Sequence, residues 1–223
     1  MKKLQKINQK RKNQLTSQLK ILLNYQVSFS QKKVKKNMKN PFATFDGYKD
    51  ACLSKIDFDD GDSARICNWL EKPRNLLYIY SDPGVGKTYL AAAITNMFLD
   101  QKKYCWYMSE QEFFNKLRSC VTDGGSYSEK IKMMCENEFL ILDDLGSTRG
   151  DEDQKQWLTP WQKEVHFAFL DNRVMSGLPT VITSNYSPHD LKNIFHERYI
   201  SRILSNKNTI IKLKGSDKRQ EGL

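Results

Sequence analysis

Residues 81–88, SDPGVGKT, have the types and spacing needed to bind a phosphate group. Gly84 and Gly86 allow a tight turn in which several backbone N–H groups point at one anion. Lys87 and Thr88 follow, and they supply an ammonium charge for phosphate and a hydroxyl ligand for Mg²⁺. We therefore predict a phosphate-binding loop here, the alternative being a Gly-rich turn that binds nothing.

The residues on either side of the loop support this prediction. Residues 76–80, LLYIY, are an apolar run of β-forming types, and a helical stretch with three consecutive alanines follows the loop. Strand, Gly-rich turn and helix is the order that a phosphate-binding loop requires. The first position of the pattern, usually glycine, holds Ser81, so the turn is slightly atypical.

Two carboxylates follow a second predicted strand. Residues 139–142 are apolar and lead directly into Asp143 and Asp144. At the carboxyl edge of a parallel sheet, Asp143 would face a nucleotide and its Mg²⁺, and Asp144 would orient and deprotonate a water molecule. An acidic turn capping a helix is the alternative, but the phosphate-binding loop in the same chain favours a nucleoside triphosphatase.

Two later stretches carry further candidate residues. Asn185 ends the predicted strand 180–185 and can reach a γ-phosphate or the attacking water by the same edge-of-sheet argument. Arg198 and Arg202 are four residues apart, so they share one helical face. They belong either to an ordinary surface helix or to an arginine finger that stabilises charge on a neighbouring subunit's nucleotide.

The charge of the chain is concentrated at one end. Residues 1–40 hold 12 Lys and Arg and no Asp or Glu, so the rest of the chain has a net charge of −2 although the total is +10. We expect a basic tail over 1–40 and a compact domain over 41–223. The tail either contacts a polyanion or is a solvated arm. Residues 1–24 have leucines on one helical face. Such a helix could dock in a partner's groove, lie on an anionic surface or act as an organelle presequence. Translation could also start at Met38.

Composition argues against several classes of protein. No apolar run approaches 18 residues and no apolar segment lies near the N-terminus, so we expect neither a membrane span nor a secretory signal. The five cysteines are scattered, which suits reduced thiols in the cytoplasm. The three histidines have no metal-ligand spacing, so we expect no zinc site.

The remaining stretches predict the elements around the candidate residues. A helix is expected over 48–71 with a break at 59–62, a strand over 103–108, and a helix to about 121 that opens with a Ser109–Glu112 capping box. Further helices are expected over 128–136 and from about Pro160 to 173, and a last strand over 209–213. Trp157 and Trp161 either pack on their helix or stack on nucleic-acid bases.

The order SDPGVGKT, FLILDDLG, TVITSN, ERYISRIL and KGSDKR resembles the AAA+ ATPases of the DnaC/DnaI helicase-loader and IstB group, over about residues 41–219. The resemblance implies an α/β P-loop NTPase fold, with a central parallel β-sheet flanked by helices and no C-terminal lid domain. It implies ATP and Mg²⁺ as cofactors, with Thr88 and Asp143 at the metal. The nucleotide-binding residues that it implies are Ser81, Asp82, Pro83, Gly84, Val85, Gly86, Lys87, Thr88, Arg198 and Arg219. The catalytic residues that it implies are Lys87, Asp143, Asp144, Asn185 and Arg202.

The same resemblance implies a role in DNA replication. We expect an ATP-hydrolysing protein that loads a replicative DNA helicase onto DNA and assembles into an ATP-dependent oligomer. Single-stranded DNA would contact Lys116, Arg118, Lys130 and Lys132, the alternative being a solvated helix face. The rival functions are an IstB-like transposition helper, a P-loop kinase for a small molecule, and a non-hydrolysing nucleotide switch.

Overall fold

The fold is seen in a computed structural model, which describes residues 41–42, 48–56, 58, 60–147 and 158–219. The predictions for the basic tail, for a start at Met38 and for Trp157 lie outside these residues. Within the described residues, no helix combines the length and apolar character needed to cross a membrane.

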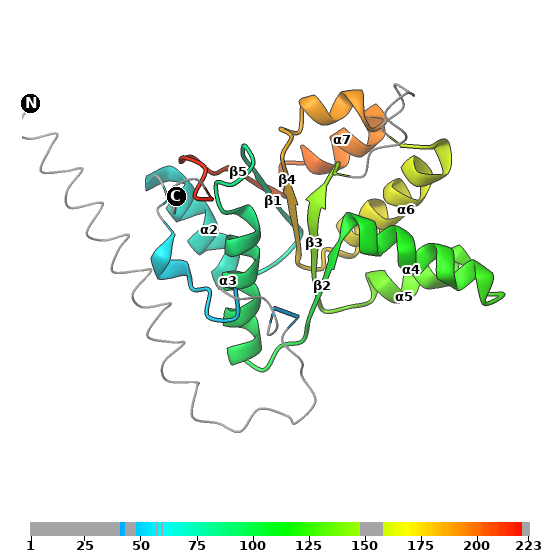
Figure 1. The fold of residues 1–223 in the computed structure, drawn as a ribbon, viewed down its shortest axis with the longest axis horizontal. Helices are drawn as coiled ribbons and strands as arrows, with labels where there is room; N and C mark the ends of the chain where they lie inside the picture. The colour runs from blue at the N-terminus through cyan, green and yellow to red at the C-terminus, as the bar shows by residue number, and fades with distance from the viewer. Residues whose placement is uncertain (1–40, 43–47, 57, 59, 148–157, 220–223) are drawn as a thin grey trace, which may run out of the picture.

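One parallel sheet organises the described chain, with its strands in the order β2-β3-β4-β1-β5 (Figure 1). The strands are β1 (Leu76–Tyr80), β2 (Cys105–Ser109), β3 (Phe139–Leu145), β4 (Thr180–Ser184) and β5 (Thr209–Lys212). The inner strands are buried along nearly their whole length, as expected for parallel strands that are covered on both faces. This burial explains their apolar runs in the sequence, and it confirms the predicted central parallel sheet.

Helices cover both faces of this sheet (Figure 1). The first face carries α2 (Asp60–Glu71) and α3 (Lys87–Asp100). The second face carries α4 (Glu110–Thr122), α5 (Tyr127–Cys135) and α6 (Pro160–Ser176). Successive strand side chains point to opposite faces. Leu77 and Ile79 of β1 therefore pack in the core under α2 and α3, whereas Leu76 and Tyr78 pack in the core under α4, α5 and α6.

The boundaries of α6 follow from its sequence. Thr159 accepts the backbone N–H of Gln162, and the Gln162 side chain accepts the N–H of Thr159, which completes a capping box in front of Pro160. The helix ends at Gly177, whose φ of 65° lies in the region that glycine adopts readily. Trp161 packs against Tyr127 with 5.2 Å between ring centroids, which favours the packing interpretation of this tryptophan.

One predicted element is partly wrong. Instead of a helix over 48–71 that breaks at 59–62, the structure has a short 3₁₀ helix, η1 (Leu53–Lys55), and then α2, which begins at Asp60. Asp62 suits this first turn because a carboxylate is stabilised by the positive end of the helix dipole. Asp62 also pairs with Arg65 one turn later. Residues 60–62, which the sequence predicted to break a helix, thus lie in the first turn of α2.

The other predicted elements agree with the structure to within about three residues at each described boundary. The short elements η2 (Asp190–Asn193) and α7 (Glu197–Ile203) lie between β4 and β5. After β5 the described chain continues to Arg219 without another helix, so these residues contain no helical lid.

Candidate functional site

A cavity of about 570 Å³ opens where β1, β3 and β4 end. Its walls come from the phosphate-binding loop, the ends of β3 and β4, the segment before α2 and the residues after β5. The lining residues are Tyr48, Lys55, Pro83, Gly84, Gly86, Lys87, Thr88, Tyr89, Asp143, Asp144, Asn185, Lys218 and Arg219. The structure thus brings Lys87, Asp143, Asp144 and Asn185 together around one cavity.

The phosphate-binding loop depends on its glycines. Gly84 has φ 79° and Gly86 has φ 112°, a region that other residues rarely adopt. A Cβ atom at Gly84 would also lie 1.7 Å from Oδ1 of Asp217, so a larger residue would have to displace that side chain. Because α3 begins at Lys87, directly after the loop, its free N–H groups and positive dipole end face the same space. The loop can therefore present backbone donors to an anion.

Lys87 is buried beside the start of the same loop. Its Nζ donates to the carbonyl oxygens of Ser81 at 3.0 Å and of Asp82 at 2.9 Å. Ser81 Oγ is a third acceptor for Lys87 Nζ, at 3.3 Å. Serine at the position where glycine is usual thus contacts the lysine of the loop. Burial lowers the pKa of Lys87, and the charges of Asp144 and Asp143 act against that shift.

Asp143 is a buried carboxylate surrounded by hydroxyl groups. Thr88 Oγ1 donates to Oδ2 at 3.1 Å, Tyr107 OH donates to Oδ2 at 2.9 Å, and Thr183 donates to Oδ1. The Thr88 and Asp143 oxygens are the type of ligand that Mg²⁺ takes together with phosphate oxygens and water. The described residues contain no group of three or more His, Cys, Asp or Glu side chains arranged for a metal. The pair therefore fits a Mg²⁺ ion whose other ligands come from nucleotide and water.

Asp144 lies in a left-handed backbone conformation, with φ 61°. Its N–H donates to Thr183 Oγ1 at 2.8 Å, and its Oδ1 accepts Nδ2 of Asn185 at 3.2 Å. The pairing of β3 with β4 shifts between Leu142 and Leu145, so the chain leaves regular strand geometry here. We call residues 144–147 the β3 turn, since the N–H of Ser147 bonds back to Asp144 O at 3.1 Å. The turn holds the Asp144 side chain at the cavity.

The two neighbouring acids have different surroundings. Asp143 accepts three hydroxyl hydrogen bonds, which suits a carboxylate that stays in place as a ligand. Burial, and next the charge of Asp143, raise the pKa of Asp144 above the ordinary aspartate value. A carboxylate with a raised pKa binds a proton more readily, which suits a general base.

The segment after β5 crosses over the phosphate-binding loop. The backbone N–H of Lys218 donates to Gly84 O at 3.1 Å, and both Lys218 and Arg219 line the cavity. Arg219, which the resemblance implies as a nucleotide-binding residue, thus lies at the cavity, and its role with nucleotide stays a prediction. Lys218 was missed although it is its neighbour in KGSDKR. Tyr48 and Tyr89 were missed too, since nothing in their spacing marks them as cavity residues.

The two arginines of α7 lie away from this cavity. Arg202 pairs with Asp171 of α6, and its guanidinium lies 5.9 Å from the centre of the Phe167 ring. Arg198 is exposed on the same helix. Neither arginine therefore belongs to the site of its own chain, and action on a neighbouring subunit stays a prediction.

The four basic residues of α4 and α5 differ in how they are neutralised. Lys116 pairs with Glu112 at 3.0 Å, one turn earlier on α4. Among the described residues, Arg118, Lys130 and Lys132 form no ion pair. These three remain available to an anion at the surface.

The parallel sheet, the loop after β1, the acidic end of β3 and the polar end of β4 together define a P-loop NTPase of the AAA+ type. The chain belongs to the IstB-like ATP binding protein family, whose profile matches residues 3–219.

Individual relatives agree with this assignment. The replicative helicase loader DnaI of Bacillus subtilis (strain 168) is 34% identical over 119 residues, which cover 53% of this chain and 36% of that protein. This chain thus spans about a third of the length of the curated relatives that it matches.

Solved structures share the fold. The crystal structure of the DnaC helicase loader has a TM-score of 0.62 at 24% identity, and the comparison covers 75% of this chain and 98% of that one. AMPPCP-bound DnaA from Aquifex aeolicus has a TM-score of 0.60 at 19% identity, with coverage of 76% and 52%. At these identities the two structures establish a common fold and no more.

Proposed function

We propose that this protein hydrolyses ATP and uses the cycle to load a replicative helicase onto DNA. The observation that carries the proposal is the convergence of Lys87, Asp143, Asp144 and Asn185 on one cavity. The relative DnaI, a replicative helicase loader by name, supports the choice of helicase loading among the tasks of such ATPases. The five free cysteines suit action in the cytoplasm.

The geometry supports a division of roles among the site residues. The loop N–H groups and Lys87 bind the β- and γ-phosphates, and Asp144 accepts the proton of the attacking water. Asn185, which contacts Asp144 Oδ1, holds this carboxylate and the water in line. Mg²⁺ bound by Thr88 and Asp143 would neutralise charge on the phosphates.

A neighbouring subunit would complete the site. In this proposal the ATP-bound protein assembles, and Arg202 leaves Asp171 to contact the nucleotide of the next subunit. Lys87→Ala should remove nucleotide binding, whereas Arg202→Ala should preserve binding and remove the dependence of turnover on protein concentration. Lys72→Ala, an exposed change at the end of α2, is the matched control. Nucleotide binding by Lys87→Ala equal to the wild type would sink the scheme.

Single-stranded DNA would contact the outer surface of α4 and α5. Arg118, Lys130 and Lys132 would neutralise backbone phosphates with little readout of base sequence. Stimulation of ATP turnover by single-stranded DNA should therefore weaken as salt rises. Stimulation by one metabolite instead would favour a P-loop kinase.

Native mass spectrometry of the protein with the replicative helicase of its own organism, in ATP and in ADP, tests the proposal. The full chain is compared with a form that starts at Met38. A complex that only the full chain forms would support helicase loading and assign docking to the basic tail. No complex in either nucleotide would instead favour an IstB-like transposition helper, which the family match also supports. A homo-oligomer on DNA would then be the next species to seek.

A further inference from the structure

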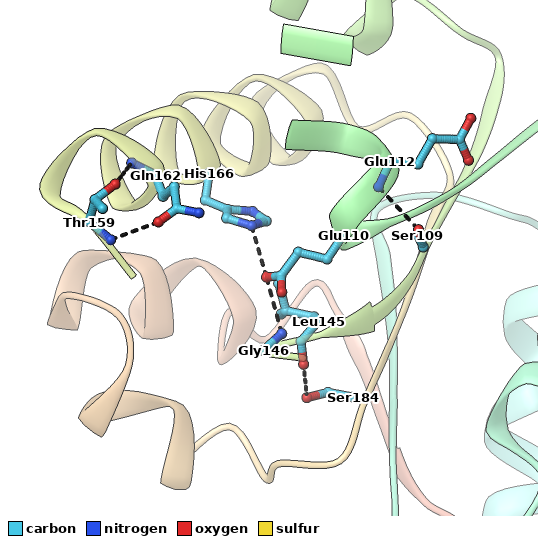
Figure 2. A network of polar contacts seen from close by, with 9 residues as sticks. All are labelled: Ser109, Glu110, Glu112, Leu145, Gly146, Thr159, Gln162, His166 and Ser184. Carbon is cyan, nitrogen blue, oxygen red and sulfur yellow. Dashed lines mark hydrogen bonds and ion pairs between the residues drawn. The ribbon is translucent and has the colours of Figure 1, made fainter. Parts of the chain in front are cut away.

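Glu110, the first residue of α4, is a buried carboxylate that the proposed hydrolysis does not use. Its side chain has no solvent exposure. Oε1 accepts the backbone N–H of Gly146 at 3.1 Å and lies 2.9 Å from Nε2 of His166 on α6 (Figure 2). Because burial of a carboxylate is unfavourable unless its oxygens have partners, contacts such as these reduce the cost of burying Glu110.

The first contact fixes the turn that carries the candidate base. Gly146 lies two residues after Asp144, in the β3 turn. Strand β4 already holds this turn at the N–H of Asp144 and at Leu145 O, which accepts Ser184 Oγ at 2.7 Å (Figure 2). Glu110 supplies a further attachment of the turn's backbone, and it comes from the opposite side, from α4.

The β3 turn needs such attachments because its backbone is unfavourable. Asp144 has a positive φ, which brings Cβ of an ordinary L-residue close to a neighbouring carbonyl oxygen. Conformations of this kind persist only where the surrounding contacts over-determine them. Loss of one attachment is therefore expected to let Asp144 relax and turn its carboxylate away from the cavity.

The second contact keeps Glu110 from moving. His166 is fully buried among aromatic rings, 5.0 Å from Phe113, 4.9 Å from Phe114 and 5.2 Å from Phe195 between ring centroids. Its Nε2 approaches Glu110 closely but outside regular hydrogen-bond geometry. The packed ring thus closes the side of Glu110 away from Gly146, and the carboxylate cannot swing off the turn without displacing it.

We propose that Glu110 is a positioning residue for ATP hydrolysis: it holds Gly146, and through the β3 turn it keeps Asp144 aimed at the attacking water. This inference rests on the proposed ATPase function. Glu110 lies between Ser109, which ends β2, and Glu112, whose N–H donates to Ser109 Oγ. The inference assigns a task to Glu110 that neither of these two residues has. Figure 2 shows Glu110 directed at His166 and Gly146, and Glu112 directed away from them.

Three variants separate positioning from general stability. Glu110→Gln keeps an oxygen that can accept the Gly146 N–H, Glu110→Met keeps the chain length but has no such acceptor, and Glu112→Met is the control. Glu112 is on the same turn of α4 and its side chain is 45% exposed. For each protein, the ATP dissociation constant, kcat and the urea midpoint are measured.

The expected result is a separation of kcat from binding. Glu110→Met should lower kcat about tenfold or more, the scale of one hydrogen bond to a buried group, with the dissociation constant changed less than about twofold. Glu110→Gln should restore kcat to within about threefold of the wild type, because the lost acceptor returns. Glu112→Met should leave both constants unchanged.

Other outcomes would overturn the inference. Glu110→Gln as slow as Glu110→Met would show that the acceptor is not what matters, and equal losses of binding and kcat would show a structural role only. If Glu110→Met does not fold, amide hydrogen exchange of the other two proteins decides. The Gly146 amide should be protected from exchange in the wild type and in Glu110→Gln. Rapid exchange of this amide in either protein would overturn the proposal. A wild type that binds ATP without hydrolysing it would instead refute the proposed function, while Gly146 protection still reports on the contact.

Discussion

Replacing Thr183 by valine should lower the free energy of unfolding by more than the small change in side-chain shape suggests. Thr183 is 1% exposed, and its hydroxyl donates to Asp143 while accepting the N–H of Asp144 at 2.8 Å. A hydrogen bond to a charged group contributes about 1.5–3 kcal/mol to stability, and an amide left without an acceptor costs about 1 kcal/mol more. Since solvent reaches part of Asp144, we expect Thr183→Val to lower the free energy of unfolding by about 2–4 kcal/mol.

Urea unfolding followed by circular dichroism measures this loss. Thr95→Val is the matched control, because Thr95 is equally buried but its hydroxyl donates to Ala91 O of its own helix, at 2.9 Å, and otherwise only contacts the Cys105 thiol at 3.8 Å. That carbonyl keeps its backbone donor, so the control should lose less than about 1 kcal/mol. Thr183→Val should also slow ATP turnover, since both acids lose a partner. Equal losses of stability in the two variants would refute the reasoning.

Three further changes test other contacts. Asp171→Asn should release Arg202 and raise turnover at limiting protein concentration by at most about fivefold, because partly exposed ion pairs contribute only about 0.2–1 kcal/mol; slower turnover would argue against the finger. Burial raises the pKa of Asp144, so its ionised form disfavours the folded state at pH 7. Asp144→Asn should therefore abolish turnover yet raise the urea midpoint, and this gain should shrink as pH falls through the raised pKa and vanish below about 3.8. Arg173→Met removes four hydrogen bonds, to Thr180 Oγ1 and three carbonyl oxygens, and should cost about 3–5 kcal/mol in urea unfolding; a loss near zero would mean that the carbonyls find other donors.

The sheet could be predicted from the sequence because its inner strands are buried on both faces. A parallel strand of this kind is a continuous apolar run, and residues 76–80 and 139–142 have that form. The candidate site could be predicted for a related reason. Lys87 and Asn185 come after β1 and β4, and Asp143 lies near the end of β3. The carboxyl ends of parallel strands meet at one edge of the sheet.

Site residues inside strands were missed because the sequence does not show how the strands pair, and the pairing decides which side chains face the site. Tyr107 and Thr183 look like ordinary strand residues. Tyr107 is the register partner of Ile141, and from β2 its hydroxyl donates to Asp143. Thr183 donates to the same Asp143 carboxylate from β4. Glu110 was passed over for a similar reason. The capping pattern indicated Ser109 and Glu112, and the N–H of Glu112 does donate to Ser109 Oγ at 3.1 Å. Nothing in that pattern marks Glu110.

The junction between β2 and α4 sets the rotational phase of the helix. Ser109 is the last residue of the strand and Glu110 is the first of α4, so no loop separates them. Each residue turns an α-helix by about 100°. One residue inserted at this junction would rotate Phe113 and Leu117 out of the core and Glu110 away from Gly146, whereas an insertion in the connection 123–126 would leave that phase intact. The spacing of the chain at this junction, as much as any side chain, is what directs α4 at the β3 turn.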